Sequence, residues 1–137
     1  MAEVKLADVQ KLRKMTSAGM MDCKKALEEA NGDFDRAVEL IRERGKAIAN
    51  KRADREASEG VVLAARSACG CSAAILTLNC ETDFVANNAD FIAFANKLLT
   101  EALKQGAKDL EAVKNLTVDG RKVTDLVVEQ SGVTGEK

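Results

Sequence analysis

Histidine, proline, tryptophan and tyrosine are missing from this sequence of 137 residues, and phenylalanine occurs only four times. Without histidine, the chain lacks the commonest general base and the commonest metal ligand. The scarcity of aromatic residues leaves almost nothing on which single-stranded nucleic acid could stack. The formal net charge of -1 gives no reason to expect a nucleic-acid or membrane partner. The composition therefore argues against histidine-based catalysis and direct nucleic-acid binding.

Long apolar runs are missing as well. No stretch approaches the roughly 20 apolar residues that span a membrane. Residues 1–14 carry mixed charge and lack the apolar centre of a signal peptide. We therefore expect a cytoplasmic chain. In a reduced compartment its cysteines should be free thiols packed as small hydrophobic residues; they are Cys23, Cys69, Cys71 and Cys80.

The sequence also lacks the patterns of cofactor sites. The cysteines do not show the paired C-x2–4-C spacing of structural zinc sites. No glycine pattern of a P-loop or a dinucleotide site occurs, so direct nucleotide binding is not expected. We expect no cofactor, no metal and no enzymatic activity. A thiol-dependent enzyme or redox protein that uses Cys69 and Cys71 remains a rival, although a catalytic cysteine would have no histidine partner.

Residues 1–45 predict three short helices around one small core. The first helix is expected over residues 6–15, and Gly45 is expected to end the third. Between the second and third, Gly32 can take a left-handed conformation and Asp33 can cap the next helix. The second helix has the clearest buried face, with the i, i+3, i+4, i+7 spacing; its members are Cys23, Ala26, Leu27 and Ala30.

The rest of the chain predicts a different architecture. Residues 46–59 favour a basic helical linker, because lysine and arginine alternate there with alanine and serine. Residues 60–80 alternate with period two around Gly70, which predicts an antiparallel hairpin that a helix must cover. A helical face between Phe91 and Ala102 supplies that cover, and a frayed tail is expected from Ser131. We predict an α+β chain with domains at 1–45 and 60–137.

Two segments are unusual for connections between elements. Residues 16–21 contain two adjacent methionines, of which one could enter the core while the other faces a partner. Residues 79–87 place Phe84 at the corner between a strand and a helix. Phe84 could pack beneath the helix, with Thr82 or Asp83 as its cap, or it could be an exposed interface anchor. Periodicity leaves both alternatives open.

These two segments resemble a known family. Residues 16–27, T-S-A-G-M-M-D-C-K-K-A-L, followed by N-G-D at 31–33, resemble the N-terminal signature of elongation factor Ts. Residues 79–86, N-C-E-T-D-F-V-A, resemble its second signature, in the family's order and at about its spacing. The resemblance runs from about Val4 to the end of the chain. Family members usually continue into a second core subdomain, and this chain stops near the point where that subdomain would begin.

The resemblance implies a three-helix module similar to ubiquitin-associated domains, then the N-terminal subdomain of the family's α+β core. It implies a nucleotide-exchange factor that binds the GTPase domain of elongation factor Tu and promotes GDP release by displacing magnesium. Asp83 and Phe84 would form the wedge, flanked by Thr82 and Val85. The docking residues would be Arg13, Met20, Met21 and Lys24, and from the linker Lys51 and Arg52.

A ubiquitin-associated-type protein-binding module fused to an unrelated α+β domain is the alternative. The three-helix segment alone would permit it, and it predicts that residues 1–45 bind ubiquitin. This alternative leaves the Thr-Asp-Phe-Val block at residues 82–85 unexplained.

Overall fold

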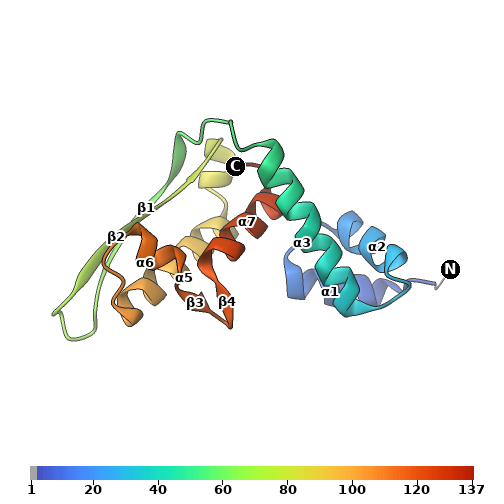
Figure 1. Cartoon of the computed structure of the whole chain (residues 1–137), viewed down its shortest axis with the longest axis horizontal. Helices are drawn as coiled ribbons and strands as arrows, with labels where there is room; N and C mark the ends of the chain where they lie inside the picture. Colours follow the sequence, from blue (N-terminus) through green and yellow to red (C-terminus); the bar gives the residue numbers. More distant parts are fainter. Residues whose placement is uncertain (1–2) are drawn as a thin grey trace. The chain divides into compact units, whose positions relative to one another are not determined.

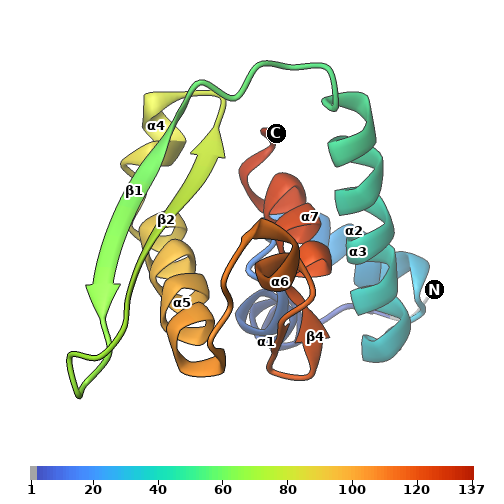
Figure 2. The same cartoon turned by 60° about the vertical axis from the view of Figure 1, so that its left-hand side comes forward.

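A computed structural model describes residues 3–137 of the chain, which form two compact units. The first unit contains the chain up to Ala53 together with Val128–Glu136, and the second contains Asp54–Val127 with Lys137. Helices make up the first unit, and an antiparallel hairpin packed on helices dominates the second (Figures 1 and 2). The predicted α+β fold class is therefore confirmed. No described helix is both long enough and apolar enough to cross a membrane.

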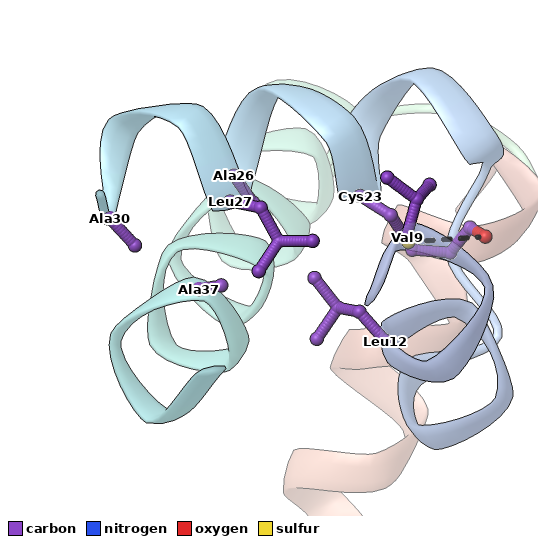
Figure 3. Close-up of a cluster of buried hydrophobic side chains, with 8 residues drawn as sticks. Val9, Leu12, Cys23, Ala26, Leu27, Ala30 and Ala37 are labelled. Atoms are coloured by element: carbon purple, nitrogen blue, oxygen red, sulfur yellow. Dashed lines mark hydrogen bonds between the residues drawn. The ribbon is translucent and has the colours of Figure 1, made fainter. Parts of the chain in front are cut away.

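The first unit is built on α1 (Leu6–Thr16), α2 (Met20–Glu29) and α3 (Phe34–Lys51). The predicted face of α2 is buried as a whole against its neighbours (Figure 3). Leu12 and Leu27 are among the most deeply buried side chains and meet at the centre of this core. The core consists of Val9, Leu12, Ala18, Cys23, Ala26, Leu27, Ala30 and Ala37.

The junction between α2 and α3 follows the sequence prediction. Asn31 and Gly32 both take positive φ angles, of 51° and 85°, which turn the chain out of α2. The Asp33 carboxylate then accepts a hydrogen bond of 3.2 Å from the backbone N–H of Arg36. This N-cap satisfies one of the donors that the first turn of α3 would otherwise leave open.

The prediction that Gly45 ends the third helix is wrong, because α3 continues to Lys51. Gly45 is buried where a second helix, α7 (Val123–Thr134), passes close to it. A Cβ atom added to Gly132 would lie 2.6 Å from the Gly45 Cα. Close packing between two backbones thus requires a glycine at position 132, whereas a Cβ atom on Gly45 would make only ordinary contacts of 3.7 Å. The helix continues through Gly45 even though glycine inside a helix costs about 1 kcal/mol relative to alanine. Arg42 and Glu129 add an ion pair of 3.0 Å.

The expectation of a frayed tail from Ser131 is also wrong, since α7 remains helical to Thr134. The contact of Gly132 with α3 gives this part of the chain a packed neighbour. Composition predicted a polar, glycine-containing end but could not show that a glycine there lets two helices approach closely.

The second unit begins with β1 (Glu59–Arg66) and β2 (Ala73–Cys80), which pair antiparallel as predicted. Val61 lies opposite Leu78, and Leu63 lies opposite Leu76. The helix α5 (Ala89–Gln105) runs along this hairpin (Figure 2) and contributes Phe91, Phe94 and Leu98 to the clusters beneath it. Gly106, with φ 69°, ends α5.

Short elements complete the second unit. A four-residue helix, α4 (Asp83–Ala86), joins the hairpin to α5, and α6 (Leu110–Lys114) follows α5. β3 (Thr117–Val118) and β4 (Arg121–Lys122) then form a small hairpin. Its turn residues, Asp119 and Gly120, both have positive φ angles, as a two-residue type I′ turn requires. Val118 is buried against Leu98 and anchors this hairpin on α5.

Limited proteolysis tests where α3 ends. Lys46 and Arg55 both lie in the stretch that the sequence predicts as a linker, but Lys46 is inside α3 whereas Arg55 is exposed outside any helix or strand. Trypsin should therefore cleave after Arg55 well before it cleaves after Lys46, because open segments are cut preferentially. Mass spectrometry of early digests measures the order. Equal rates at both sites, or first cuts inside α2, would contradict this assignment.

Candidate protein-binding surfaces

The corner between β2 and α5 is held by a chain of local hydrogen bonds. Thr82 is the N-cap of α4, and its hydroxyl oxygen accepts from the backbone N–H of Val85 at 3.5 Å. The buried Cys80 thiol donates to the Thr82 carbonyl oxygen at 3.1 Å. Asn88 then caps α5, because its side-chain oxygen accepts from the N–H groups of Asp90 and Phe91 at 2.9 and 3.2 Å. These bonds fix the backbone on both sides of α4.

Phe84 projects from this corner into solvent. Its exposed fraction is 84%, the highest among the large apolar residues that are exposed. The neighbouring Val85 instead packs against the cluster of Cys80, Ala86 and Phe91. The alternative in which Phe84 packs beneath the helix is therefore wrong, because Val85 and Ala86 supply the buried contacts of α4. Asp83 is exposed beside Phe84, whereas Thr82 is half-buried.

A second candidate surface lies on the first unit, where α1 ends and α2 begins. Met20 is half-buried and packs against the core, whereas Met21 is 63% exposed. The structure thus places one methionine on the core and the other in solvent, as expected, and contact of Met21 with a partner stays a prediction. Lys24 is exposed one turn further along α2, on the same face as Met21. Its 3.8 Å ion pair with Glu28 is exposed and therefore weak. Arg13 is exposed in the last turn of α1.

Lys51 and Arg52 occupy a different part of the first unit. They lie at and just beyond the C-terminal end of α3, where Lys51 is exposed and Arg52 is half-buried. The residues of α3 that pack on the core end at Ile41. Lys51 is ten residues further along, or about 15 Å of helix. Arg13, Met21 and Lys24 thus lie in the last turn of α1 and the first turns of α2, whereas Lys51 lies at the C-terminal end of α3.

The described residues offer little for covalent chemistry at either surface. No group of three or more metal-ligating side chains occurs in the described part of the chain. The Cys23 thiol is enclosed in the helical core, where burial raises its pKa. Both surfaces consist of side chains suited to binding another protein.

Some exposed apolar residues were not identified as site candidates from the sequence. Alternation in the hairpin predicts two faces but does not say which one a helix covers, so the exposure of Val62 and Ile75 could not be foreseen. Leu110 is exposed at the start of α6, where a single turn of helix gives no usable periodicity.

The two adjacent methionines permit a matched substitution test. Met20→Ala should destabilise the first unit by about 2 kcal/mol, the lower end for a core methionine, because Met20 is only half-buried. Met21→Ala should leave the melting temperature nearly unchanged and weaken binding to the partner protein that docks on this surface. Met15→Ala is the control, because Met15 is exposed on α1 outside the proposed docking set. Thermal melts and binding titrations separate the two roles, and a Met21→Ala variant that only loses stability would contradict the docking role.

Taken separately, the two units define a class of protein: an α-helical module and an α+β module, each exposing side chains for contact with a partner. The family model for elongation factor Ts matches residues 81–137. Over 134 residues, or 98% of this chain, the sequence is 55% identical to elongation factor Ts of Phocaeicola vulgatus and 53% identical to that of Bacteroides thetaiotaomicron. It is 50% identical over 137 residues to elongation factor Ts of Azobacteroides pseudotrichonymphae.

These matches confirm the resemblance: the chain is similar to elongation factor Ts along almost its whole length. It spans 40% of the length of the first two relatives and 49% of the third.

Proposed function

We propose that this chain acts in translation elongation as a nucleotide-exchange factor, which binds elongation factor Tu in its GDP form and promotes GDP release. The observation that carries the proposal is the exposed Phe84 on the capped corner of α4, inside a segment that the elongation factor Ts family model covers. An exposed aromatic side chain on a rigid backbone segment is a typical interface anchor. Asp83 and Phe84, flanked by Thr82 and Val85, insert beside the nucleotide site and displace the magnesium ion.

Exchange of this kind requires no covalent chemistry. A partner that holds the nucleotide-free GTPase more tightly than the nucleotide-bound form must weaken nucleotide binding by the same coupling free energy. We therefore propose a non-enzymatic protein that binds neither nucleotide nor nucleic acid itself. Docking through Arg13, Met21 and Lys24, with Met20 packed on the core beside them, supplies binding energy, and the α4 corner supplies the preference for the magnesium-free state.

The alternative of a ubiquitin-associated-type module fused to an unrelated domain accounts for the three helices alone. The relatives named elongation factor Ts match 98% of the chain, and the family model covers the second unit from residue 81 onward. The proposed exchange function uses both units, so it explains more of the sequence.

Release of a fluorescent GDP analogue from elongation factor Tu tests the proposal. The chain should accelerate release in a saturable manner, and added magnesium should reduce the acceleration, because magnesium opposes the state that the wedge stabilises. Binding is measured in parallel by titration. Binding without any acceleration would limit the chain to a docking role, and neither binding nor acceleration would refute the proposal.

A further inference from the structure

The connection between β1 and β2 carries two cysteines that the proposed exchange function does not use. Cys69 and Cys71 are both exposed in this connection, residues 67–72, whereas Cys23 and Cys80 are buried. The turn has a defined backbone. Ser67 N–H donates to the Ser72 carbonyl at 2.8 Å, and Gly70 N–H donates to the Ser67 carbonyl at 2.9 Å. The two thiols are therefore displayed at the tip of an ordered hairpin.

The spacing of these cysteines permits a direct bond between them. Two residues of fully extended chain span at most about 7 Å, and a turn shortens that span into the usual Cα separation of disulfides, about 4.4–6.8 Å. Gly70 lies between them with φ 72°, and nothing lies within 4 Å of where its Cβ would be. A small reagent can thus approach the turn, and the glycine can adjust its backbone while the ring closes.

Hydrogen bonds give the two thiols different roles. The Ser67 hydroxyl lies 3.4 Å from the Cys69 sulfur, and the Cys71 thiol donates to the Cys69 carbonyl oxygen at 3.7 Å. Hydrogen bonds from Cys71 and Ser67 lower the pKa of Cys69 to about 7, and the bond to Cys69 raises the pKa of Cys71. The Cys69 thiolate is therefore suited to attack a disulfide in the first step of an exchange reaction, and the Cys71 thiol to attack in the second step. Arg66 is the nearest charged residue along the chain.

We propose that Cys69-Gly70-Cys71 is a thiol–disulfide exchange site that reacts with a low-molecular-weight disulfide, such as glutathione disulfide, and closes to a Cys69–Cys71 disulfide. The Cys69 thiolate attacks one sulfur of the reagent, which forms a mixed disulfide and releases one glutathione thiolate. Cys71 then loses its proton to solvent and attacks the Cys69 sulfur, which releases the second glutathione thiolate. Two protein thiols are oxidised, and the reagent disulfide is reduced to two thiols.

The expected rate follows from the thiolate population. With a pKa of about 7, half of Cys69 is thiolate at pH 7, which is about 50 times the thiolate fraction of a thiol at the ordinary value of 9.0. A thiolate of lower pKa is also less nucleophilic, by about six- to tenfold over two units. Cys69 should therefore react about five to eight times faster than an ordinary exposed cysteine at pH 7.

The test incubates the reduced full chain with glutathione disulfide at pH 7, quenches with acid and maps peptides by mass spectrometry. The wild-type peptide containing residues 67–72 should lose two hydrogen atoms. Cys71→Ser should instead accumulate glutathione at Cys69, and Cys69→Ser should react several-fold more slowly at Cys71. Ser67→Ala, which removes one hydrogen bond to Cys69, should slow the Cys69 reaction.

The pH dependence separates the two thiols further. The rate of the Cys71→Ser variant, in which the serine hydroxyl can still donate to Cys69, should level off at a lower pH than that of the Cys69→Ser variant. A wild-type chain that keeps glutathione on Cys69 without closing the ring would overturn the proposal. Equal rates for the two single variants at every pH would overturn it as well.

Discussion

Replacing Phe84 with alanine should slow chain-stimulated GDP release from elongation factor Tu by about 30-fold and leave the melting temperature nearly unchanged. The rate effect assumes that an aromatic anchor of this kind contributes about 2 kcal/mol at its interface. The stability effect should be small because Phe84 is 84% exposed and makes no contribution to the buried clusters. Docking through the first unit should persist, so the loss of binding should be smaller than the loss of rate.

Two matched variants give this experiment its controls. Phe91→Ala removes the same side chain from a position that is 5% exposed, and it should destabilise the second unit by about 3–5 kcal/mol. Leu110→Ala truncates another exposed apolar residue and should alter neither exchange nor stability. Stopped-flow release and thermal melts on the three variants distinguish the possibilities. A Phe84→Ala chain that exchanges at the parental rate, or that melts like Phe91→Ala, would refute the wedge.

Much of the fold could be predicted from the sequence because the spacing of its apolar residues agrees with the positions of its helix-capping and turn residues. The Cys23–Ala30 face, the Asp33 cap and the Gly106 end of α5 each combine a helical spacing with a residue suited to the adjacent turn. The prediction for Gly45 was wrong because the sequence alone does not distinguish a glycine that ends a helix from a glycine that lies beneath a crossing helix. Only the position of Gly132 shows which role Gly45 has.

The candidate site was less predictable. Periodicity placed Phe84 at a corner but could not say whether it was buried, because α4 has only four residues and shows less than two turns of pattern. The methionine pair was easier, since adjacent residues on a helix cannot both face one core. The resemblance suggested Lys51 and Arg52 as docking residues, and the structure places them at the C-terminal end of α3, beyond the last α3 residues that pack on the helical core.

Replacing Leu27 with alanine should have the largest effect on the first unit. Leu27 is 1% exposed at the centre of the helical core, so truncation removes its burial and leaves a cavity, at a cost of about 2–5 kcal/mol. Domains are typically stable by about 5–15 kcal/mol, and small ones lie at the low end of that range. The substitution should therefore populate an open form of α1 and α2, which hydrogen exchange reports as lost amide protection.

Leu6→Ala is the matched control for this prediction, because Leu6 is 64% exposed on α1 and the same atoms are removed. It should leave amide protection unchanged. In the Leu27→Ala chain, α5 should keep its protection, since its buried residues Phe91 and Leu98 pack in clusters that contain no residue of α1, α2 or α3. Exchange on elongation factor Tu should nevertheless fall, because the proposed docking residues Met21 and Lys24 lie on α2. Loss of protection in α5 together with α2 would show that the two units unfold as one, and normal protection in α2 would show that Leu27 is not central to the core.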